Sequence, residues 1–409
     1  MATSRSARDI RSQSRFAVLS ALLAEPEMSR SELASATSLS TATVATLITE
    51  LLYEGIVVEA DRDTSGVGRP TTRLRIDPDR AFIVGVDVAE TYVRSTLFDL
   101  SLKERESTQI SLDEHQNSPT YVVEGVRAAV DEVLTAAAVE RARVAGVGIS
   151  LPGLVQPDSG VSVFAPNWAW RDVHLLDELR KEINLPLVAD NPLKALATAE
   201  LWFGAGTSSS SLATVNLGTG VGAGIIINGS VFRGVDNNAG EWGHTLLSLD
   251  GRRCGCGRRG CVEAYVGVEG IRETLRGIDP DHALLKLEGQ SEFVEGLARA
   301  LEVTPRDETA HHVMSATGRY LGAALADLAA MVNPESITLN GWITWMLSRW
   351  FMPSAKAAFA EFYTVGSADR DLITMSQVRG NPVSLGVAAL AFEKFLADIG
   401  LPSLTRTLT

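Results

Sequence analysis

The stretch EWGHTLLSLDGRRCGCGRRGCVE, residues 241–263, contains all three cysteines of this 409-residue chain. Cys254, Cys256 and Cys261 lie within eight positions, and His244 precedes the first of them by ten. Three thiolates and one imidazole form a tetrahedral donor set that suits zinc, and the neighbouring glycines allow a tight loop around an ion. Because four protein ligands leave no position for a catalytic water, the pattern predicts a structural zinc site. The alternative is three unconnected thiols.

Two carboxylates, Glu241 and Glu263, flank the metal ligands and are not needed by the ion. A loop braced by zinc would hold both side chains rigidly, because the surroundings of a metal fix the rotamers of neighbouring residues. This arrangement favours the binding of a polar ligand close to the metal loop.

The overall composition is that of a soluble globular protein. Its 409 residues are 45% hydrophobic and 21% charged, which suits two or three domains with their own cores. The N-terminus lacks the apolar segment of a signal peptide, and no apolar run is long enough to span a membrane. The odd cysteine count argues against a disulfide framework. We therefore expect a cytoplasmic protein with no membrane partner.

Negative charge is concentrated outside the N-terminal region. Residues 1–78 carry nine arginines and no lysine against ten carboxylates, so nearly all of the net charge of −13 lies in the rest of the chain. Four arginines, opposed only by Asp9, form a small basic arm at the N-terminus: Arg5, Arg8, Arg11 and Arg15. Such an arm could contact a phosphate backbone, and the alternative is a solvated tail.

The N-terminal region predicts three helices, of which the second and third form a helix-turn-helix. Apolar residues at helical spacing place the first helix at residues 14–24. Ser29 and Glu32 form a capping box for a second helix that ends near Thr37, and Ser40 caps the third. The outer face of the third helix carries small polar side chains that fit a major groove. They are Thr41, Thr43, Thr46 and Thr49.

A glycine-rich hairpin follows the third helix. Residues 56–59 and 71–76 are expected to form its strands, and the tip between them, residues 61–70, includes Arg69. Such a tip is the wing of a winged helix, which can place an arginine in the minor groove. Residues 1–78 are therefore predicted to bind operator DNA, and the alternative is a packing module without DNA. The expected DNA contacts are Arg30, Ser40, Thr41, Thr43, Thr46 and Arg69.

The rest of the chain repeats one pattern, a strand, a polar turn and a return strand, at residues 82–98 and 212–227. Each copy is followed by helical stretches, which predicts two related α/β lobes with a ligand cleft between them. We place the first lobe at residues 79–190, with a helix at 385–400 packing back on it, and the second at 191–384. Further strands are expected at 144–149, 186–189 and 336–339, and a long helix at 313–332.

The second copy of the pattern contains a glycine-rich turn, GTGVGAG, at residues 218–224. A turn of this kind after a strand can cradle phosphate with its backbone N–H groups. Glycines also serve hairpin geometry and close packing, so this motif alone leaves both interpretations open.

Several motifs together resemble the ROK family of sugar-responsive repressors and sugar kinases. They are the EWGH and CGCGRRGCVE pair, the LGTGVGAG turn, the LPG of residues 151–153, the APN of residues 165–167 and the winged helix. The resemblance implies an actin-like ATPase (ribonuclease H-like) fold of two lobes, a sugar pocket in the cleft, zinc on the four ligands, and a homodimer or homotetramer. By motif match, the sugar contacts fall on Asn167, Asn191, Glu241, His244 and Glu263.

The chain departs from the kinase members of that family at the general base. Those members resemble one another in an Asn-Asp pair followed by a helix that ends in Glu. Counted back from Glu200, this chain has Asn191 followed by Pro192. Proline cannot accept the proton that a sugar hydroxyl loses during phosphoryl transfer. Asp190 aligns with the base only if an insertion or deletion is introduced.

The nucleotide motifs depart as well. The first phosphate loop of the family resembles Asp-x-Gly-Gly-Thr, whereas residues 87–91 read DVAET and place Glu90 where backbone should approach phosphate. The region that resembles the adenosine motif, LNGW at residues 339–342, puts the large indole of Trp342 beside its one glycine.

These features predict a sugar-responsive transcriptional regulator, most simply a repressor, with no catalytic residues. We expect it to bind operator DNA through the winged helix and a sugar or sugar phosphate in the cleft without phosphorylating it. One alternative is a ROK sugar kinase with an attached DNA-binding head. Another is a regulator whose pocket has lost its ligand.

Overall fold

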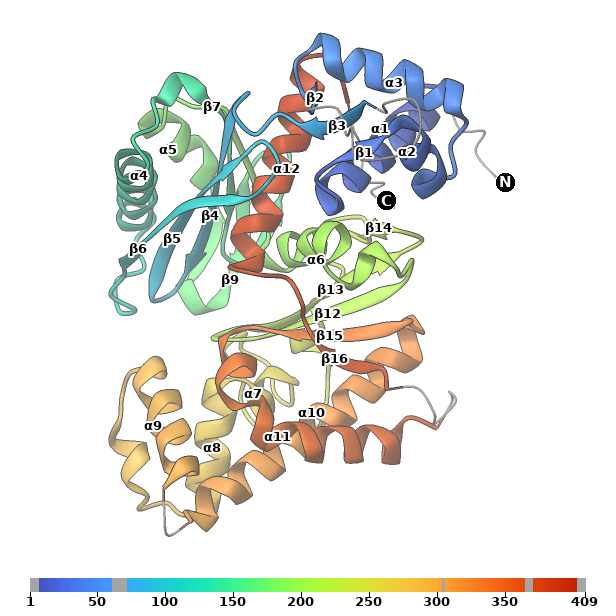
Figure 1. Cartoon of the computed structure of the whole chain (residues 1–409). Coiled ribbons are helices and arrows are strands. Elements are labelled where there is room, and N and C mark those ends of the chain that lie inside the picture. Colours follow the sequence, from blue (N-terminus) through green and yellow to red (C-terminus); the bar gives the residue numbers. More distant parts are fainter. Residues whose placement is uncertain (1–6, 61–71, 304–305, 365–370, 403–409) are drawn as a thin grey trace. The chain divides into compact units, whose positions relative to one another are not determined.

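The computed structural model in Figure 1 describes residues 7–60, 72–303, 306–364 and 371–402. The chain divides into two compact units, one comprising Met1–Phe203 and Val378–Leu408 and the other Gly204–Gln377. Among the described helices, none is both long enough and apolar enough to cross a membrane.

The first unit begins with a small domain, called the head below, of three helices and a three-stranded sheet (Figure 1). Its helices are α1 (Ala7–Ala24), α2 (Arg30–Thr37) and α3 (Thr41–Tyr53). Its strands lie in the order β1 (Met28–Ser29), β3 (Arg73–Ile76) and β2 (Val57–Glu59).

Local hydrogen bonds set the helix-turn-helix as predicted. The Glu32 amide donates to the Ser29 hydroxyl at 3.2 Å, and the Ser29 amide donates to the Glu32 carboxylate at 2.7 Å, which completes the capping box. The Thr43 amide donates to the Ser40 hydroxyl at 3.1 Å, so Ser40 caps α3. Between the helices, Ser38 has a φ of 55°, the left-handed conformation of a tight turn.

The head differs from the prediction in two places. α1 begins at Ala7 and not at residue 14. The prediction missed its first turns because they carry no apolar stripe: Ile10 is 52% exposed. The short strand β1 was not predicted, because two residues are too few to show the alternation of a strand and Ser29 also serves as the N-cap of α2. Both predicted wing strands are present as β2 and β3, whereas residues 61–70 lie outside the described residues.

Two five-stranded sheets, one in each unit, have the same topology. In the first, the order is β11 (Leu187–Asp190), β7 (Val144–Ser150), β4 (Phe82–Ala89), β5 (Tyr92–Asp99), β6 (Glu104–Ser111). In the second, it is β16 (Ile373–Met375), β15 (Ser336–Asn340), β12 (Leu212–Leu217), β13 (Val221–Ile227), β14 (Ser230–Val231). The central strand of each pairs antiparallel with the next strand along the chain and parallel with the one after the crossover. The prediction of two related lobes is confirmed.

Helices and a small sheet complete the two units. In the first unit these are α4 (Pro119–Ala136), η1 (Arg141–Arg143), β8 (Leu154–Gln156), β9 (Val161–Ala165), η2 (Pro166–Trp168), β10 (Trp170–Val173), α5 (Leu175–Glu182), α6 (Pro192–Phe203) and α12 (Pro382–Asp398). In the second they are η3 (Ala205–Thr207), η4 (Trp242–His244), α7 (Glu263–Val266), α8 (Val268–Ile278), η5 (Ala283–Lys286), α9 (Gln290–Glu302), α10 (Glu308–Val332) and α11 (Trp342–Phe362).

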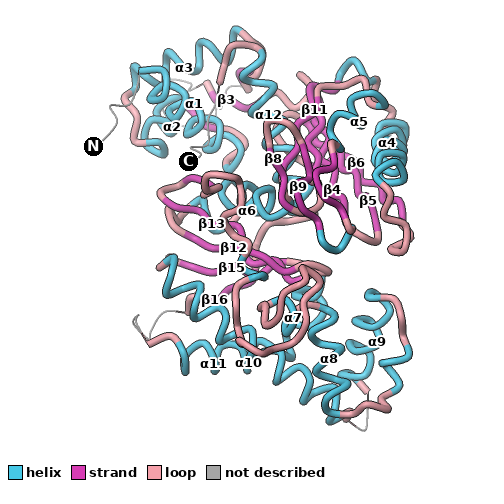
Figure 2. The backbone as a smooth tube through the Cα atoms, turned by 180° about the vertical axis from the view of Figure 1, so that it is seen from behind, coloured by secondary structure: helices cyan, strands magenta, loops and turns pink. Residues whose placement is uncertain are grey.

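Alternating residues of β4 place helices on both faces of the first sheet (Figures 1 and 2). Val84 and Val86 lie in one apolar core with Val126 of α4. On the other face α12 approaches so closely that a Cβ on Gly85 would lie 2.0 Å from the Ser384 carbonyl oxygen. α12 is thus joined to the sheet backbone to backbone, because glycine leaves no side chain between them.

Candidate functional site

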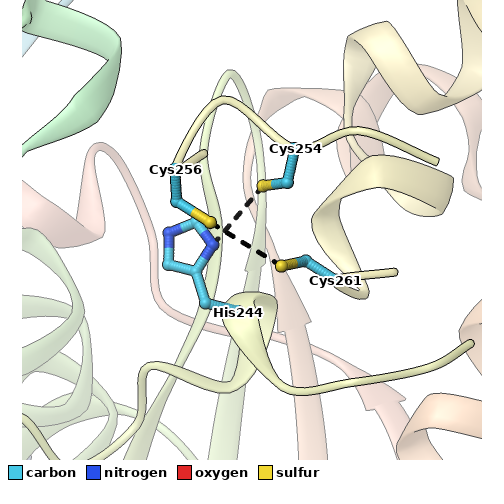
Figure 3. A group of neighbouring side chains, drawn as sticks. All are labelled: His244, Cys254, Cys256 and Cys261. Carbon is cyan, nitrogen blue, oxygen red and sulfur yellow. Dashed lines mark hydrogen bonds between the residues drawn. The ribbon is translucent and has the colours of Figure 1, made fainter. Parts of the chain in front are cut away.

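Four potential metal ligands converge in the segment from η4 to the start of α7. They are His244, Cys254, Cys256 and Cys261, and one donor atom of each lies within 4.8 Å of all the others. Figure 3 shows the four side chains pointing toward one another. The structure therefore brings together the whole set that the sequence predicted as metal ligands.

The separations between these donor atoms suit a tetrahedral ion. Cys254 Sγ lies 3.6 Å from His244 Nδ1, and Cys256 Sγ lies 3.7 Å from Cys261 Sγ. Bonds of about 2.0–2.3 Å to a tetrahedral zinc ion place neighbouring ligands about 3.3–3.8 Å apart. Burial raises the pKa of the Cys254 and Cys261 thiols, and a bound cation would reverse that effect by stabilising the thiolates. These four residues could hold a metal ion.

The loop around this cluster depends on one glycine and one arginine. Gly260 has a φ of 76°, and a Cβ there would lie 1.7 Å from the Ser248 carbonyl oxygen. The Arg258 guanidinium donates to the His244 carbonyl oxygen at 2.6 Å, which connects the cysteine loop to η4. The CGCGRRGC sequence therefore folds into a closed knuckle because its turns need glycine and its arginine ties them together.

Glu263 connects the metal loop to the second sheet. It is the first residue of α7, and its carboxylate accepts from the Val221 amide at 2.9 Å through one oxygen. The other oxygen lies 3.4 Å from Cys254 Sγ. Val221 is the first residue of β13, directly after the glycine-rich turn, so metal ligands, carboxylate and turn meet at one place. Glu241 immediately precedes η4 and is half-buried.

The glycine-rich turn forms a tight hairpin with an indole beside it. Leu217 pairs with Val221, and the Gly218 amide donates to the Gly220 carbonyl oxygen at 3.2 Å. A Cβ on Gly218 would lie 3.3 Å from Nε1 of Trp342, the first residue of α11. Close packing against Trp342 accounts for a glycine at position 218, and both interpretations of the motif stay open.

The first unit holds the two remaining residues that the family motifs match to sugar contacts. Asn167, in η2, is exposed, and its amide donates to the Glu90 carboxylate at 3.2 Å. Asn191 is buried just before α6. Its side-chain oxygen Oδ1 accepts from the Leu193 backbone amide at 2.8 Å, and its side-chain nitrogen Nδ2 donates to the Gly153 carbonyl oxygen. Its side chain thus fixes the start of α6. Glu241, His244 and Glu263 lie in the second unit.

Asp87, the first residue of the segment that resembles the family's first phosphate loop, accepts hydrogen bonds from two donors. The Tyr92 hydroxyl donates to its carboxylate at 3.0 Å, and the Asn381 amide donates to the same oxygen at 2.9 Å. Burial raises the pKa of Asp87, although both hydrogen bonds oppose that effect. Asn381 lies 294 positions from Asp87 in the chain, so no local sequence signal could have revealed this contact.

The outer face of α3 is small and polar, as predicted, but its members are not equivalent. Thr41 and Thr46 are exposed, and the Thr46 hydroxyl donates to its own helix at the Ala42 carbonyl oxygen. Thr43 is half-buried, with its hydroxyl 2.8 Å from that of Ser40.

The predicted arginine contacts have different environments. Arg30 is 39% exposed and lies 3.6 Å from the Glu59 carboxylate. Arg69 lies outside the described residues. The prediction of a basic arm is wrong for Arg15, which is 4% exposed and bonded to Glu50 within the head. Its burial follows from its position on the inner face of α1, which a charge count does not reveal.

Two family models match the sequence. The model described as "Winged helix-turn-helix DNA-binding" matches residues 11–58, and the model described as "ROK family" matches residues 83–394, most of the chain. The chain belongs to the ROK family. Its head and its two sheets thus correspond to a DNA-binding module and a ROK domain, as the sequence motifs indicated.

Repressors and kinases both occur among ROK proteins similar to this chain. The xylose repressor of Bacillus subtilis (strain 168) is 27% identical over 383 residues, 93% of this chain and 94% of that protein. A glucokinase of Halalkalibacterium halodurans is 32% identical over 268 residues, 64% of this chain and 80% of that protein. The crystal structure of a ROK family transcriptional regulator, a homolog of E. coli MLC protein, matches with a TM-score of 0.74 and 25% identity, covering 95% of this chain and 98% of that one.

Proposed function

We propose that this ROK protein is a sugar-responsive transcriptional repressor that binds operator DNA through its head and a sugar through its ROK domain without phosphorylating it. The observation that carries the proposal is the presence of a winged helix-turn-helix and a ROK domain in one chain. The similarity to the xylose repressor extends over 94% of that protein, which supports the same division of labour here.

For DNA binding we propose α3 as the recognition helix and the wing as a second contact. Thr41 and Thr46 offer hydroxyls on a face of small residues, which lets the helix approach base edges. Ser40 and Thr43 would act near the phosphates, where capped helix N-termini bind anions. Arg30 and Arg69 would contact phosphate or the minor groove.

For the metal site we propose structural zinc on His244, Cys254, Cys256 and Cys261. Three sulfurs and one imidazole suit zinc better than magnesium or calcium, which prefer oxygen. Bound there, zinc would supply a closed brace and no activated water. The support comes from Glu263: its carboxylate touches both Cys254 and the Val221 amide, so bracing the loop would hold that side chain still.

For the sugar we propose the five residues that the ROK motifs indicate: Asn167 and Asn191 in the first unit and Glu241, His244 and Glu263 in the second. Amide, carboxylate and imidazole groups provide both donors and acceptors, which suits a ring with many hydroxyls. If one nitrogen of His244 binds zinc, the other remains for a sugar hydroxyl, so the two roles are compatible.

Three features support binding without phosphoryl transfer. Pro192 is the first residue of α6 and lacks a carboxylate at the position of the base. The neighbouring Asp190 is 1% exposed and accepts from the Asn191 amide at 2.8 Å, so it is turned into the fold. Asp87 is occupied by Tyr92 and Asn381, which supports a phosphate loop that no longer serves nucleotide.

The second candidate is a sugar kinase with an attached DNA-binding head. The glucokinase match favours it, because its identity of 32% over 268 residues is higher than the 27% over 383 residues shared with the xylose repressor. Losing the general base costs about 10²- to 10⁴-fold in rate, and poorer phosphate positioning would multiply the loss.

We also propose a DNA-binding domain at residues 1–78 followed by two lobes. The sequence suggested lobe boundaries at residues 190 and 384, but α6 and the segment from Val378 belong to the first compact unit, so we propose Gly204–Gln377 for the second lobe. A homodimer or homotetramer would suit this protein, because helix-turn-helix proteins commonly bind two half-sites as dimers. A cytoplasmic location would suit it too, since DNA and reduced thiols are found together there.

A gel-shift titration with a duplex from the region upstream of the protein's own gene tests this function. We expect binding that weakens steeply with salt, as arginines release counterions from phosphates. A panel of pentoses, hexoses and their phosphates, D-xylose first, should include one compound that changes the affinity. The proposed DNA contacts would be rejected if the protein did not bind the duplex. They would also be rejected if Thr46→Ala and Arg69→Ala both bound it as tightly as the wild type.

A further inference from the structure

Two helices of the first unit begin at the same edge of its sheet. α6 follows the parallel strand β11 directly, and its first turn is fixed by the Asn191 side chain. α12 begins after Asn381, whose amide reaches Asp87 near the end of the parallel strand β4. The carboxyl ends of parallel strands are where α/β folds usually bind their ligands. Both helices therefore start where a ligand of this unit is expected.

The two helices are packed against each other without intervening side chains. A Cβ on Gly386 of α12 would lie 1.8 Å from the Ala195 carbonyl oxygen of α6. α12 is also pressed against the sheet, since a Cβ on Gly148 of β7 would lie 1.8 Å from the Val387 carbonyl oxygen. Backbones in such contact cannot slide independently, so a displacement at one end of these helices is carried to the other end.

The far end of α6 meets the head in an aromatic cluster that also includes a residue of α12. Trp202, at the end of α6, is 2% exposed, and its ring lies edge-on to Phe16 of α1 at a centroid distance of 5.0 Å. The same indole lies 6.2 Å from the ring of Phe392 in α12. Phe16 of the head thus contacts α6 at Trp202, and Trp202 in turn contacts α12.

Arg15 of α1 connects this junction to the recognition helix. Its guanidinium donates to the Pro402 carbonyl oxygen at 2.7 Å and to the Glu50 carboxylate of α3 at 2.8 Å. Burial of Glu50 favours the neutral acid, but the hydrogen bonds from Arg15 and Arg11 outweigh it and hold the pKa of this carboxyl below its usual range. A buried guanidinium needs its acceptors, so the positions of Pro402 and α3 are tied together.

Pro402 is in turn fixed to the end of α12. The Gly400 amide donates to the Ala397 carbonyl oxygen at 3.1 Å, and the Leu401 amide donates to Leu396 at 2.7 Å. These bonds fold the segment after α12 back on its last turn. A continuous set of contacts therefore runs from the carboxyl end of β4 through α12 and Arg15 to α3.

We propose that Arg15 is a positioning residue that couples the effector state of the ROK domain to the recognition helix. This proposal rests on the proposed function, because coupling requires both a sugar and an operator. Arg15 itself does not reach DNA: its guanidinium holds α3 in the orientation that α12 sets. A sugar that favours one arrangement of α6 and α12 then changes operator affinity, and by linkage the operator changes sugar affinity by the same factor.

Fluorescence anisotropy with the full chain and the upstream duplex measures this coupling. Operator affinity is determined with and without saturating D-xylose, or whichever sugar of the panel is active on the wild type. We expect the ratio of the two affinities to be about tenfold or more in the wild type. In Arg15→Met it should fall to within about twofold of unity, while calorimetry shows sugar affinity of the free protein unchanged. Arg15→Lys should restore part of the ratio, because one ammonium can reach an acceptor.

Arg11→Met is the matched control, because Arg11 also bonds to Glu50 but has no bond to Pro402 among the described contacts. It should keep the ratio, whatever it does to operator affinity itself. If Arg15→Met does not fold, Phe16→Leu tests the same junction and should lower the ratio through the weakened contact with Trp202. An Arg15→Met variant, or Phe16→Leu in its place, that weakens operator binding but keeps the full ratio would overturn the proposal. A wild type whose operator affinity no sugar changes would instead reject the proposed function, and with it this coupling.

Discussion

The turn between β4 and β5 and the turn between β12 and β13 occupy the same place in two sheets of identical topology, yet they are closed by different chemistry. In the first, Ala89 pairs with Tyr92, so the turn consists of Glu90 and Thr91 and contains no glycine. In the second, Leu217 pairs with Val221, and the turn between them is Gly-Thr-Gly. The two sheets keep the same topology although each has its own core, whereas the turns at their edges differ in sequence and can differ in function.

The difference also extends to what stabilises each turn. Hydrogen bonds from Tyr92 and Asn381 to buried Asp87 close the first turn from within. The second is held from outside, by Trp342 against Gly218 and by Glu263 on the Val221 amide. The first turn thus depends on side-chain hydrogen bonds, and the second on close backbone packing and the metal loop. Each dependence can be broken separately.

The largest effect is expected from the metal loop. Cys256→Ser should lower the free energy of unfolding by more than about 3 kcal/mol, because loss of a structural metal is among the most destabilising changes known for single residues. Sugar affinity should fall with it, since Glu263 loses its brace. Thermal unfolding, sugar titration and elemental analysis measure these effects, with the exposed Asp250→Asn in the same loop as the control. If protein purified without chelator contained no stoichiometric zinc, zinc would not be what stabilises this loop.

Gly341→Ala is expected to have the next largest effect, at the backbone contact that precedes Trp342. Gly341 has a φ of 91°, and a Cβ there would lie 2.2 Å from the Leu217 carbonyl oxygen. Strain and overpacking together should cost about 2–4 kcal/mol in chemical denaturation. Gly277→Ala, in α8 with open space around it, should be neutral or stabilising. Equal effects of the two changes would mean that the second turn does not depend on this contact.

Tyr92→Phe tests the first turn and should have a smaller effect. Removing one hydroxyl donor from buried Asp87 should cost about 1 kcal/mol of unfolding free energy, since Asn381 still donates. Tyr53→Phe removes a hydroxyl from a ring that is 87% exposed and should leave stability unchanged. If Tyr92→Phe has no effect on denaturation either, side-chain hydrogen bonds do not close this turn.

The sequence predicted those features that depend on neighbours along the chain. The capping box of Ser29 and Glu32, the repeated strand pairs and the spacing of the cysteines are all local patterns with one physical meaning. The contact of Asp87 with Asn381 joins residues 294 positions apart, and Phe16 meets Trp202 across two domains of the first unit. Such pairings follow from how elements pack, which periodicity does not specify.

Charge was the least reliable guide in the head. Arg15 was counted with a basic arm because the sequence shows its charge and not its environment, yet the fold buries it between Pro402 and Glu50. The reverse holds for the metal ligands, whose residue types leave little choice of chemistry. Sequence patterns therefore predicted the convergence of His244 with the three cysteines better than the electrostatics of the head.

Isothermal titration calorimetry with a panel of pentoses, hexoses and their phosphates, run with and without ATP and magnesium, tests the central claim most directly. One sugar should give saturable binding heat that is the same under both conditions, because the proposal gives the protein no general base at Pro192 and no nucleotide site. Continuous heat of turnover at ordinary kinase rates when ATP and magnesium are present would contradict the account and establish a sugar kinase with a DNA-binding head.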